Sequence, residues 1–425
     1  MIFDEIAAKP DILISLQANI ESVTKSRDMK TKELAAIINE KAAQYKDYTA
    51  ENLSKLVKIK SLSGEEKAVQ EEVMRQMCEA GFDEVKMDGL GNVLGRIGSG
   101  KKVLAIDGHI DTVDVGNPEN WNMDPFSGLI ADGFVHGRGT VDQKGGIASA
   151  ITAGRILKEI GLQNDITLWV VASVMEEDCD GLCWKYIIEE DKFRPDFVIS
   201  TEPTNLNVYR GHRGRMEIHV SFRGLSAHGS APERGKNAVY MASRAALEIE
   251  KLHERLTFDE FLGKGSVTIS EFISGSPSLC AVADYARFHL DRRLTWGETK
   301  ESAVAEVKEA VNNPDSKVEV LWYDGLAFTG LKYGMEKYYP TWKMPEDHPA
   351  VQTGVTAFTE LFGKAPIVDK WTFSTNGIAT NGIHKIPTIG FGPGNEVMAH
   401  APNEKTPVSD LVSASAFYAL YTQIL

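Results

Sequence analysis

Short apolar runs and amphipathic segments alternate along much of the chain, and this pattern predicts strands and helices in turn. Runs of near-continuous apolar residues are typical of strands buried on both faces of a sheet. They lie at Val103–Asp107, Ile166–Met175, Phe197–Ser200 and Ile386–Phe391. Helical stretches lie between them at Lys144–Ile160 and about Leu182–Glu190. The alternation predicts an α/β domain with a mostly parallel sheet.

Residues 212–342 follow a different pattern. From Met216 to Phe222, apolar and polar residues alternate, as in a strand with one face in water. A helix, two strands, a helix and a strand are then predicted near Asn237–Leu256, Val267–Ile273, Tyr285–Leu294, Lys300–Val311 and Val318–Tyr323. The order β-α-β-β-α-β predicts a ferredoxin-like α+β domain. Because an apolar strand returns after it, we expect residues 1–211 and 343–425 to form one domain and residues 212–342 an inserted one.

The first 60 residues have a helical pattern, with Asp11, Ser22 and Thr49 as expected N-cap residues. The start of the chain lacks the basic segment and apolar core of a signal peptide. The longest apolar run, near Leu168–Met175, is too short to cross a bilayer. We therefore expect a cytoplasmic protein without a membrane partner.

The net charge, the cysteine content and the absence of one motif each argue against a class of protein. The net charge of −14 disfavours binding to nucleic acid, because an acidic surface repels phosphate backbones. The four cysteines are few and irregularly spaced, which argues against a disulfide framework. The absence of a Gly-x-Ser-x-Gly motif counts against a serine hydrolase.

Acidic residues and histidines follow each predicted buried strand. The carboxyl ends of such strands meet at one rim of an open α/β sheet, where ligands bind. The residues placed there are His109, the pair Glu176 and Glu177, Glu202 and, through a Gly/Pro loop, His400; Asp142 precedes the helix that begins near Lys144. Crowded carboxylates repel one another, and a divalent cation would remove that repulsion. Imidazole and carboxylate ligands suit zinc, and the lack of cysteine ligands favours an open catalytic site over a closed structural one.

The motifs at these positions resemble those of the M20 metallopeptidase family, in the family's order. They are Gly108–Val113, Gly137–Gly145, Met175–Glu177, Ser200–Thr204 and Ala399–Glu404, with Gly224–Pro232 and Gly235–Ala238 in the inserted segment. The resemblance extends from about residue 50 to the C-terminus. The family includes acetylornithine and succinyl-diaminopimelate deacylases, carboxypeptidases, dipeptidases and aminoacylases. The spacing after the Glu pair is most similar to the subgroup described as selenium-metabolism hydrolases.

The resemblance implies a role for each matched residue. His109 and Glu202 would bind one zinc ion, Glu177 and His400 the other, and Asp142 both, giving two Zn²⁺ per subunit, with Co²⁺ or Mn²⁺ also acceptable. Asp111 would orient His109. Glu176 would be the general base, taking a proton from the attacking water and passing it to the leaving amine.

The inserted domain would act as a lid and dimerise the protein. In the family, the residue that matches His228 reaches the partner's active site and stabilises the developing oxyanion. Arg293 matches the family's Asp-x-Arg pattern, whose arginine grips a substrate carboxylate. Strand alternation places Arg293 with His289 and Asp291, and Arg292 on the apolar face.

Two positions depart from the family pattern. Cys280 stands where the family often has an asparagine that contacts substrate. The segment Ser374–Gly377 replaces a Gly-Thr-Asp or Gly-Thr-Ser segment, which suggests Asn376 as a different polar contact with the substrate.

The function expected from these features is metal-dependent hydrolysis of an amide bond in a small carboxylate-bearing substrate, either an N-acyl amino acid or a dipeptide. Two alternatives stay open: an aminopeptidase acting on longer peptides, and a non-catalytic binding protein that keeps the fold. Loss of the base or of a ligand would favour the second alternative, but all the matched positions are filled.

Overall fold

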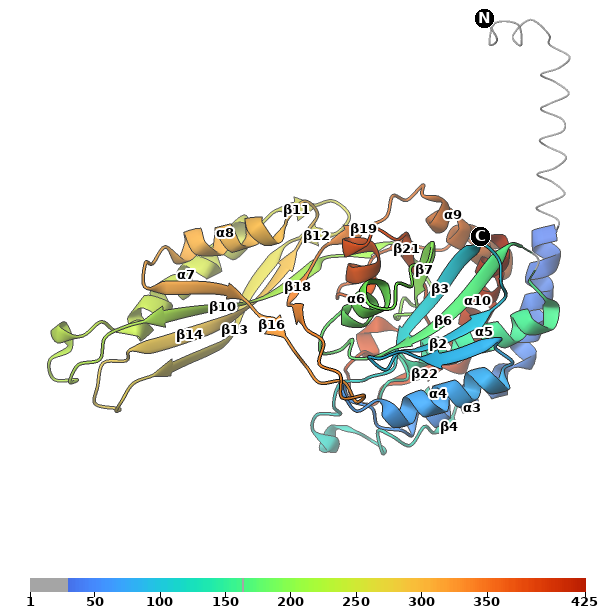
Figure 1. Cartoon of the computed structure of the whole chain (residues 1–425), viewed down its shortest axis with the longest axis horizontal. Coiled ribbons are helices and arrows are strands. Elements are labelled where there is room, and N and C mark those ends of the chain that lie inside the picture. The colour runs from blue at the N-terminus through green and yellow to red at the C-terminus, as the bar shows by residue number, and fades with distance from the viewer. Residues whose placement is uncertain (1–29, 163) are drawn as a thin grey trace, which may run out of the picture.

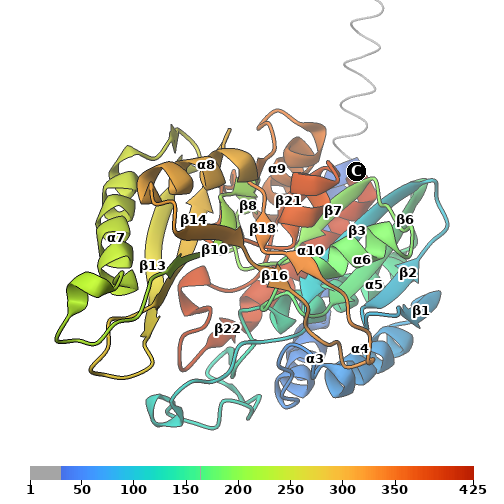
Figure 2. The ribbon, with the colours of Figure 1, turned by 60° about the vertical axis from the view of Figure 1, so that its left-hand side comes forward.

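The structure, a computed structural model, describes residues 30–162 and 164–425. Two hydrophobic clusters organise these residues, one in each of the two bodies that the ribbon forms (Figures 1 and 2). The larger cluster takes side chains from residues 34–209 and 327–421, and the smaller one takes them from residues 216–311. The segment that carries the smaller cluster extends to one side of the larger body in both views.

An eight-stranded sheet crosses the larger body in the order β1-β2-β6-β3-β7-β21-β8-β20. These strands are β1 (Glu84–Met87), β2 (Val93–Ile97), β6 (Ile166–Ser173), β3 (Lys102–His109), β7 (Phe197–Ser200), β21 (Thr388–Gly390), β8 (Val208–Tyr209) and β20 (Val368–Asp369). The central strands β6, β3, β7 and β21 run parallel, as do β8 and β20. Pairing is antiparallel at β1–β2, β2–β6 and β21–β8. The expected mostly parallel sheet is therefore confirmed.

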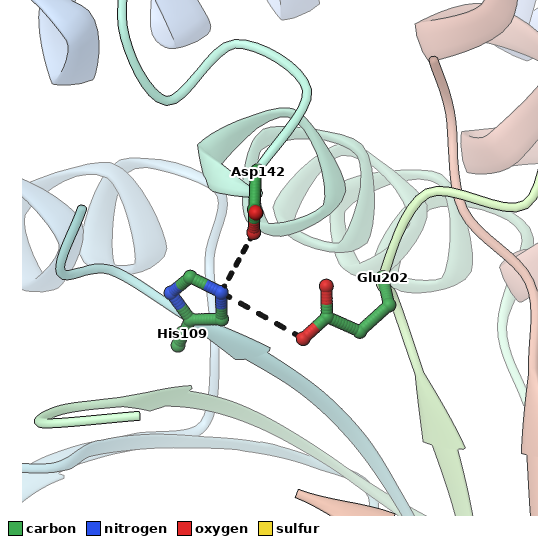
Figure 3. Close-up of side chains that lie close together, drawn as sticks. All are labelled: His109, Asp142 and Glu202. Carbon is green, nitrogen blue, oxygen red and sulfur yellow. Dashed lines mark hydrogen bonds and ion pairs between the residues drawn. The ribbon is translucent and has the colours of Figure 1, made fainter. Parts of the chain in front are cut away.

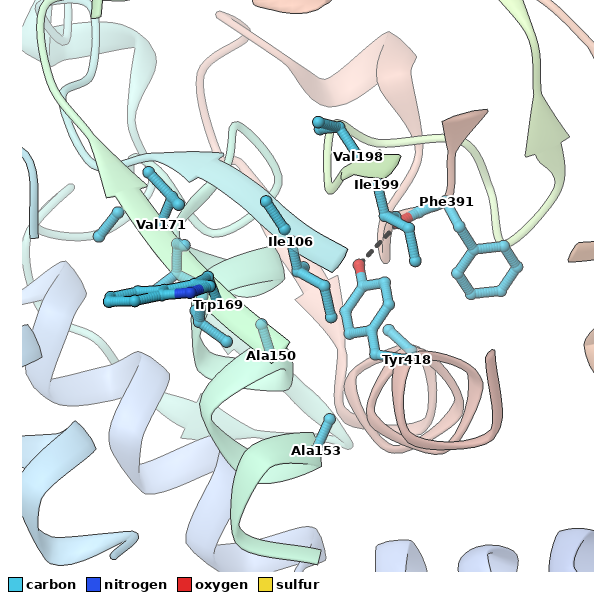
Figure 4. Close-up of a cluster of buried hydrophobic side chains, with 14 of the residues drawn as sticks. Ile106, Ala150, Ala153, Trp169, Val171, Val198, Ile199, Phe391 and Tyr418 are labelled. Atoms are coloured by element: carbon cyan, nitrogen blue, oxygen red, sulfur yellow. Dashed lines mark hydrogen bonds between the residues drawn. The ribbon is translucent and has the colours of Figure 1, made fainter. Parts of the chain in front are cut away.

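Helices cover both faces of this sheet. Helix α5 (Lys144–Ile160) packs on β3 and β6 and against α3 (Lys46–Val57) and α10 (Val408–Ile424). Figure 4 shows Ile106 of β3 directed toward α5 and α10, where the Tyr418 hydroxyl donates to the Phe391 carbonyl at 2.6 Å. The next side chain, Asp107, points the other way toward Trp184 of α6 (Leu182–Glu189). Helices α4 (Lys67–Glu79) and α9 (Pro349–Phe362) complete the layers, with η3 (Ile378–Ile383) beside α6.

The inserted segment builds an antiparallel sheet covered by two helices. Its main strands are β10 (Gly214–Arg223), β13 (Ser266–Gly275), β14 (Tyr285–Leu294) and β15 (Ser316–Val320), in the order β13-β14-β10-β15, and the short β18 (Tyr338–Tyr339) also pairs with β10. Helices α7 (Ala238–Arg255) and α8 (Lys300–Val311) lie against it (Figure 2). The chain order is the predicted β-α-β-β-α-β, so the predicted fold class is confirmed for both parts. We refer to this segment as the lid.

Short strands surround these sheets and tie the lid to the larger body. Strand β9 (Gly211–His212) pairs with β19 (Trp342–Lys343) where the chain passes between the two bodies. The others are β4 (Ile130–Ala131), β5 (Phe134–His136), β11 (Phe258–Asp259), β12 (Gly263–Lys264), β16 (Trp322–Tyr323), β17 (Met335–Glu336), β18 (Tyr338–Tyr339) and β22 (Lys405–Pro407). Single 3₁₀ turns are η1 (Pro118–Asn120), η2 (Pro232–Arg234) and η4 (Glu396–Met398).

The N-terminal prediction is partly corrected. Residues 30–44 are helical, but Thr49 lies inside α3 rather than at its start. Its hydroxyl donates to the carbonyl of Tyr45 at 2.9 Å, a contact typical of threonine within a helix. The expected caps Asp11 and Ser22 lie outside the described residues. Over the described part of the chain, no helix is long and apolar enough to cross a membrane.

Candidate metal centre and substrate pocket

Two groups of potential metal ligands share one residue, Asp142. His109, Asp142 and Glu202 form the first group, and Asp142, Glu177 and His400 the second. In each group the ligand atoms lie within 4.8 Å of one another. The His109 Nε2 atom lies 2.9 Å from Asp142 Oδ1 and 3.7 Å from Glu202 Oε1 (Figure 3). The His400 Nε2 atom lies 3.2 Å from Asp142 Oδ2 and 3.0 Å from Glu177 Oε2.

The parallel sheet places these side chains together. His109 ends β3, and Glu202 stands two residues beyond the end of β7. Glu176 and Glu177 follow β6. Because neighbouring parallel strands end at the same rim, residues far apart in the sequence become neighbours. The strand order therefore brings His109, Glu177 and Glu202 together, while Asp142 reaches them from the loop before α5 and His400 from the loop after η4.

The ring of His109 is oriented for ligation. Its Nδ1 atom lies 2.9 Å from the carbonyl oxygen of Asp111, a contact in which the ring nitrogen donates. A proton on Nδ1 leaves the lone pair on Nε2, which faces Asp142 and Glu202. Asp111 thus acts mainly through its main chain, since its nearer carboxylate oxygen is 3.5 Å from Nδ1.

The carboxylate of Asp111 has a second task that the sequence did not indicate. It accepts the backbone N–H groups of Glu176 at 3.2 Å and Glu177 at 3.0 Å. The Ser63 hydroxyl also donates to it, at 2.7 Å. One buried aspartate therefore connects the loop after β3 to the Glu pair after β6.

Glu404 holds the loop that carries Asp142. Its carboxylate is fully buried and accepts the backbone N–H groups of Gly139, Val141 and Asp142 at 3.1, 2.7 and 3.1 Å. Arg138 donates to the same carboxylate at 2.6 Å. Glu404 belongs to the motif Ala399–Glu404, but the motif alone does not indicate this role. Its contact with Arg138 joins residues far apart in the sequence, so only the folded structure reveals it.

Glu66 supports the turn before the Glu pair. Its Oε1 atom accepts the backbone N–H of Met175 at 3.1 Å, and Met175 has a left-handed backbone with φ of 59°. The Oε2 atom of Glu66 is buried and has no hydrogen-bond partner among the described residues. Burial, followed by the neighbouring charge of Asp111, raises the pKa of Glu66 to about 8.

Burial dominates the electrostatics of the ligand cluster. It raises the pKa of Glu202 well above the usual range, and the charge of Asp142 adds to the effect. Burial likewise raises the pKa of Glu177 to about 7. Hydrogen bonds with Asp142 and Glu177 raise the pKa of His400 to about 10. The cluster therefore stabilises bound positive charge, which is the property required of a cation site.

A cavity of about 300 Å³ opens beside the ligand cluster. One wall carries Glu176, which is 5% exposed and belongs to neither ligand group. Two lid arginines, Arg215 and Arg293, line the same cavity. Asp180, Phe373, Ser374 and Glu396 also line it. The cavity thus lies between the ligand cluster of the larger body and the cationic side chains of the lid.

Arg293 lies on the face predicted by strand alternation. Along β14 every second residue is buried, and Arg293 shares the more open face with His289 and Asp291. Its Nε and Nη2 atoms donate to the two oxygens of Asp291 at 2.7 and 2.9 Å. Arg292 is buried and bonds to Glu298 and Glu306, so its predicted orientation toward the apolar face is also confirmed.

Asn376 does not contact the cavity, and the prediction that it binds substrate is wrong. The side chain is 1% exposed and all its hydrogen-bonding groups are used within the protein. Its Nδ2 atom donates to Asp107 and Ser173 at 3.0 and 3.1 Å, and its Oδ1 atom accepts from the backbone N–H of Gly181 at 2.9 Å and from the Cys183 thiol at 3.1 Å. Ser374, two residues earlier, lines the cavity in its place.

His228 is exposed and does not line the cavity of its own chain. It belongs to the segment between β10 and α7, and this segment extends to the end of the lid away from the larger body (Figure 1). The backbone N–H of Ser230 donates to its Nδ1 atom at 3.1 Å, so the proton of the neutral ring is on Nε2. Nε2 is therefore available as a hydrogen-bond donor.

Known proteins match most of the chain. Residues 105–423 match the family model "Peptidase family M20/M25/M40". The uncharacterized protein YgeY of Escherichia coli (strain K12) is 52% identical over 385 residues, covering 90% of this chain and 96% of its own. The acetylornithine deacetylase of Proteus mirabilis is 28% identical over 318 residues, covering 74% of this chain and 77% of its own.

Solved structures share the fold. The aminopeptidase PepT from Bacillus cereus superposes with a TM-score of 0.68 at 22% identity, covering 89% of this chain and 98% of its own. The YXEP protein of Bacillus subtilis, described as a dinuclear metal-binding peptidase of the M20 family, gives 0.66 at 15% identity, with coverages of 90% and 98%. At these identities the likeness establishes the fold alone.

Glu66→Gln should increase the free energy of unfolding relative to wild type, by an amount that grows from about pH 5 to pH 8. In this window the unfolded chain has lost the Glu66 proton while the folded chain keeps it, because the folded pKa is about 8. The contribution of Glu66 to wild-type stability therefore falls as pH rises, by at most roughly 1.4 kcal/mol per pH unit, and glutamine removes that loss. Denaturant unfolding of the metal-free protein at several pH values measures the difference.

The control for this measurement is Glu65→Gln, which changes an exposed neighbour and should show no such trend. A Glu66→Gln effect of constant size at every pH would contradict the raised pKa.

Proposed function

The chain belongs to peptidase family M20/M25/M40, and we propose that it is a two-metal hydrolase that cleaves an amide bond in a small carboxylate-bearing substrate. The substrate would be an N-acyl amino acid or a dipeptide. The observation that carries the proposal is the position of Asp142, whose two carboxylate oxygens each lie against a different histidine. A carboxylate placed in this way can bridge two cations.

The residues present fit a pair of divalent metals. Buried carboxylate oxygens without hydrogen-bond partners are costly, and within the described chain Glu202 Oε2 and Glu176 Oε1 are two of them. His109, Glu202 and Asp142 would hold one metal, and Asp142, Glu177 and His400 the other. Imidazole and carboxylate donors suit Zn²⁺, and Co²⁺ or Mn²⁺ can use the same set. Metals bound there would lower the pKa of a water molecule and polarise the scissile carbonyl.

Glu176 is the proposed general base. It lines the cavity, and its Oε2 atom is 3.8 Å from the ring of His109. Burial raises the pKa of its carboxyl well above the usual value, which makes it a stronger proton acceptor once ionised. It would take a proton from the attacking water and donate it to the leaving amine. Asp111 would keep it in place through the backbone N–H bond.

Arg293 is the proposed contact for the substrate carboxylate. Asp291 occupies its Nε–Nη2 edge and fixes the plane of the guanidinium. The Nη1 atom has no partner in Asp291, so the N–H groups at the Nη1–Nη2 end can donate to a substrate carboxylate. A cavity of about 300 Å³ suits a small molecule and disfavours the alternative of a long peptide substrate.

A homodimer formed through the lid is proposed to complete the site. His228 belongs to a segment that extends to the far end of the lid, with Nε2 free to donate, so it could reach a partner's active site and stabilise an oxyanion there. Large apolar side chains exposed on the lid support an interface, among them Tyr240, Leu247 and Phe272. The proposed domains are residues 1–211 with 343–425 and residues 212–342, and the proposed location is the cytoplasm.

Glu176→Gln should lower turnover by roughly 10²- to 10⁴-fold, because glutamine keeps the size of the side chain but cannot accept the proton. Metal content should be unchanged, whereas Glu177→Gln should lose metal. Steady-state kinetics on N-acyl amino acids and dipeptides, with elemental analysis, separate these effects. Chelation should abolish wild-type activity and zinc should restore it; full activity in protein shown to be metal-free would exclude the proposal.

His228→Ala should slow catalysis by on the order of 100-fold, the loss expected for one oxyanion hydrogen bond, with metal content intact. Mixing this variant with Glu176→Gln subunits should restore activity, because a mixed dimer contains one site with both wild-type residues. The mixed dimers must be verified by mass, using tagged subunits. No recovery in such dimers would rule out a shared site.

Arg293→Ala should remove most of the preference for a free acid over its carboxamide. The charged guanidinium stabilises only the acid, so kcat/KM for the acid should fall by about 10- to 100-fold and that for the carboxamide should change little. A wild-type enzyme that cleaves both forms equally well would count against a carboxylate contact at Arg293.

A further inference from the structure

Arg215 and Arg293 stand directly opposite each other in the lid sheet. The register of the antiparallel β10–β14 pair joins Arg215 to Arg293, and both side chains lie on its more open face. Both also line the cavity beside the metal-ligand cluster. Like charges at directly opposed positions destabilise a sheet, because their side chains start only about 5 Å apart. The arrangement therefore calls for negative charge at the same place.

Protein carboxylates supply part of that charge. Arg215 donates from Nη2 to Asp180 Oδ1 at 2.9 Å, and Arg293 is bonded to Asp291. The Ser374 hydroxyl donates to the other oxygen of Asp180 and so fixes that carboxylate. The guanidinium of Arg215 also lies 4.6 Å from the centre of the Tyr339 ring. Arg215 is thus held firmly in the cavity wall.

These contacts leave donor groups of Arg215 unused. Its Nε atom is buried and has no hydrogen-bond partner among the residues the structure describes. A guanidinium carries five N–H groups, and the single bond to Asp180 uses one of them. An unpaired buried donor is costly, so Arg215 is a cation in the cavity wall whose hydrogen-bonding capacity the protein does not fill.

We propose that Arg215 is a specificity-determining residue that binds the substrate carboxylate together with Arg293. A carboxylate between the two guanidiniums relieves their mutual repulsion and bonds to donors that the protein leaves open. Asp180, Ser374 and Tyr339 position Arg215 for this contact. The inference rests on the proposed function, since it assigns a residue of the same site to its substrate.

The competing explanation is structural. Arg215 belongs to the lid and Asp180 to the larger body, so their ion pair could simply tie the two bodies together. Removing the charge of Arg215 or that of Asp180 would then change the activity on acids and carboxamides in the same way. If Arg215 binds substrate, the two losses differ, because Asp180→Asn keeps an acceptor for Arg215 but removes a competing negative charge.

The test compares Arg215→Gln, Asp180→Asn and the control Arg223→Gln, which changes an exposed arginine on the same strand. The substrates are N-acetyl-L-alanine and L-alanyl-L-alanine, each with its carboxamide. Arg215→Gln should lower kcat/KM for the free acids by about 10- to 100-fold and leave the carboxamides within about threefold. Asp180→Asn should retain or increase the preference for the acid, and Arg223→Gln should match wild type.

Equal losses on acid and carboxamide in both Arg215→Gln and Asp180→Asn would overturn the inference in favour of the structural tie. An unchanged acid preference in Arg215→Gln would overturn it as well. Calorimetric binding of the same compounds to zinc-loaded Glu176→Gln protein, with and without Arg215→Gln, gives a second readout that needs no turnover. Lack of hydrolysis by wild type would refute the proposed function, while the binding data would still decide the role of Arg215.

Discussion

Mutual repulsion among buried carboxylates is the constraint on which the rest of the site depends. Asp142, Glu176 and Glu202 are almost fully buried at one rim of the sheet, where water cannot screen their charges. Left alone, such a group lowers stability or takes up protons, as the raised pKa values of Glu176 and Glu202 indicate. The fold tolerates the arrangement because other segments hold the carboxylates at fixed positions around the imidazoles.

The holding groups bind mainly main-chain atoms, which explains how the site keeps its shape. Asp111 accepts two N–H groups of the Glu pair, and Glu404 accepts three from the loop of Asp142. Backbone N–H groups have little freedom once a loop is fixed, so each such carboxylate fixes several residues at once.

Local patterns predicted the central strands and the helices beside them, but not the edge strands β1 and β20, and contacts between distant segments were not predictable. Buried strands such as β3 and β7 show their apolar character directly, and strand alternation correctly separated Arg292 from Arg293. The positions of His109, Glu177 and Glu202 just after predicted strands then indicated that these side chains lie close together. Asn376 was misassigned because a motif position does not reveal which way a side chain points. The pairing of Arg215 with Arg293 depends on strand register, which no single strand pattern contains.

The cavity also depends on how the two bodies meet. The ligand cluster comes from the larger body and the arginines from the lid, so neither body alone forms the complete binding surface. A substrate with its scissile carbonyl near Glu176 and its carboxylate at the arginines would contact both bodies at once. Such a ligand would bind more tightly when both contacts exist. It would shift the protein toward that arrangement by the difference between its binding free energies with and without the second contact. Charge on such a substrate would therefore contribute to assembling the site as well as to binding in it.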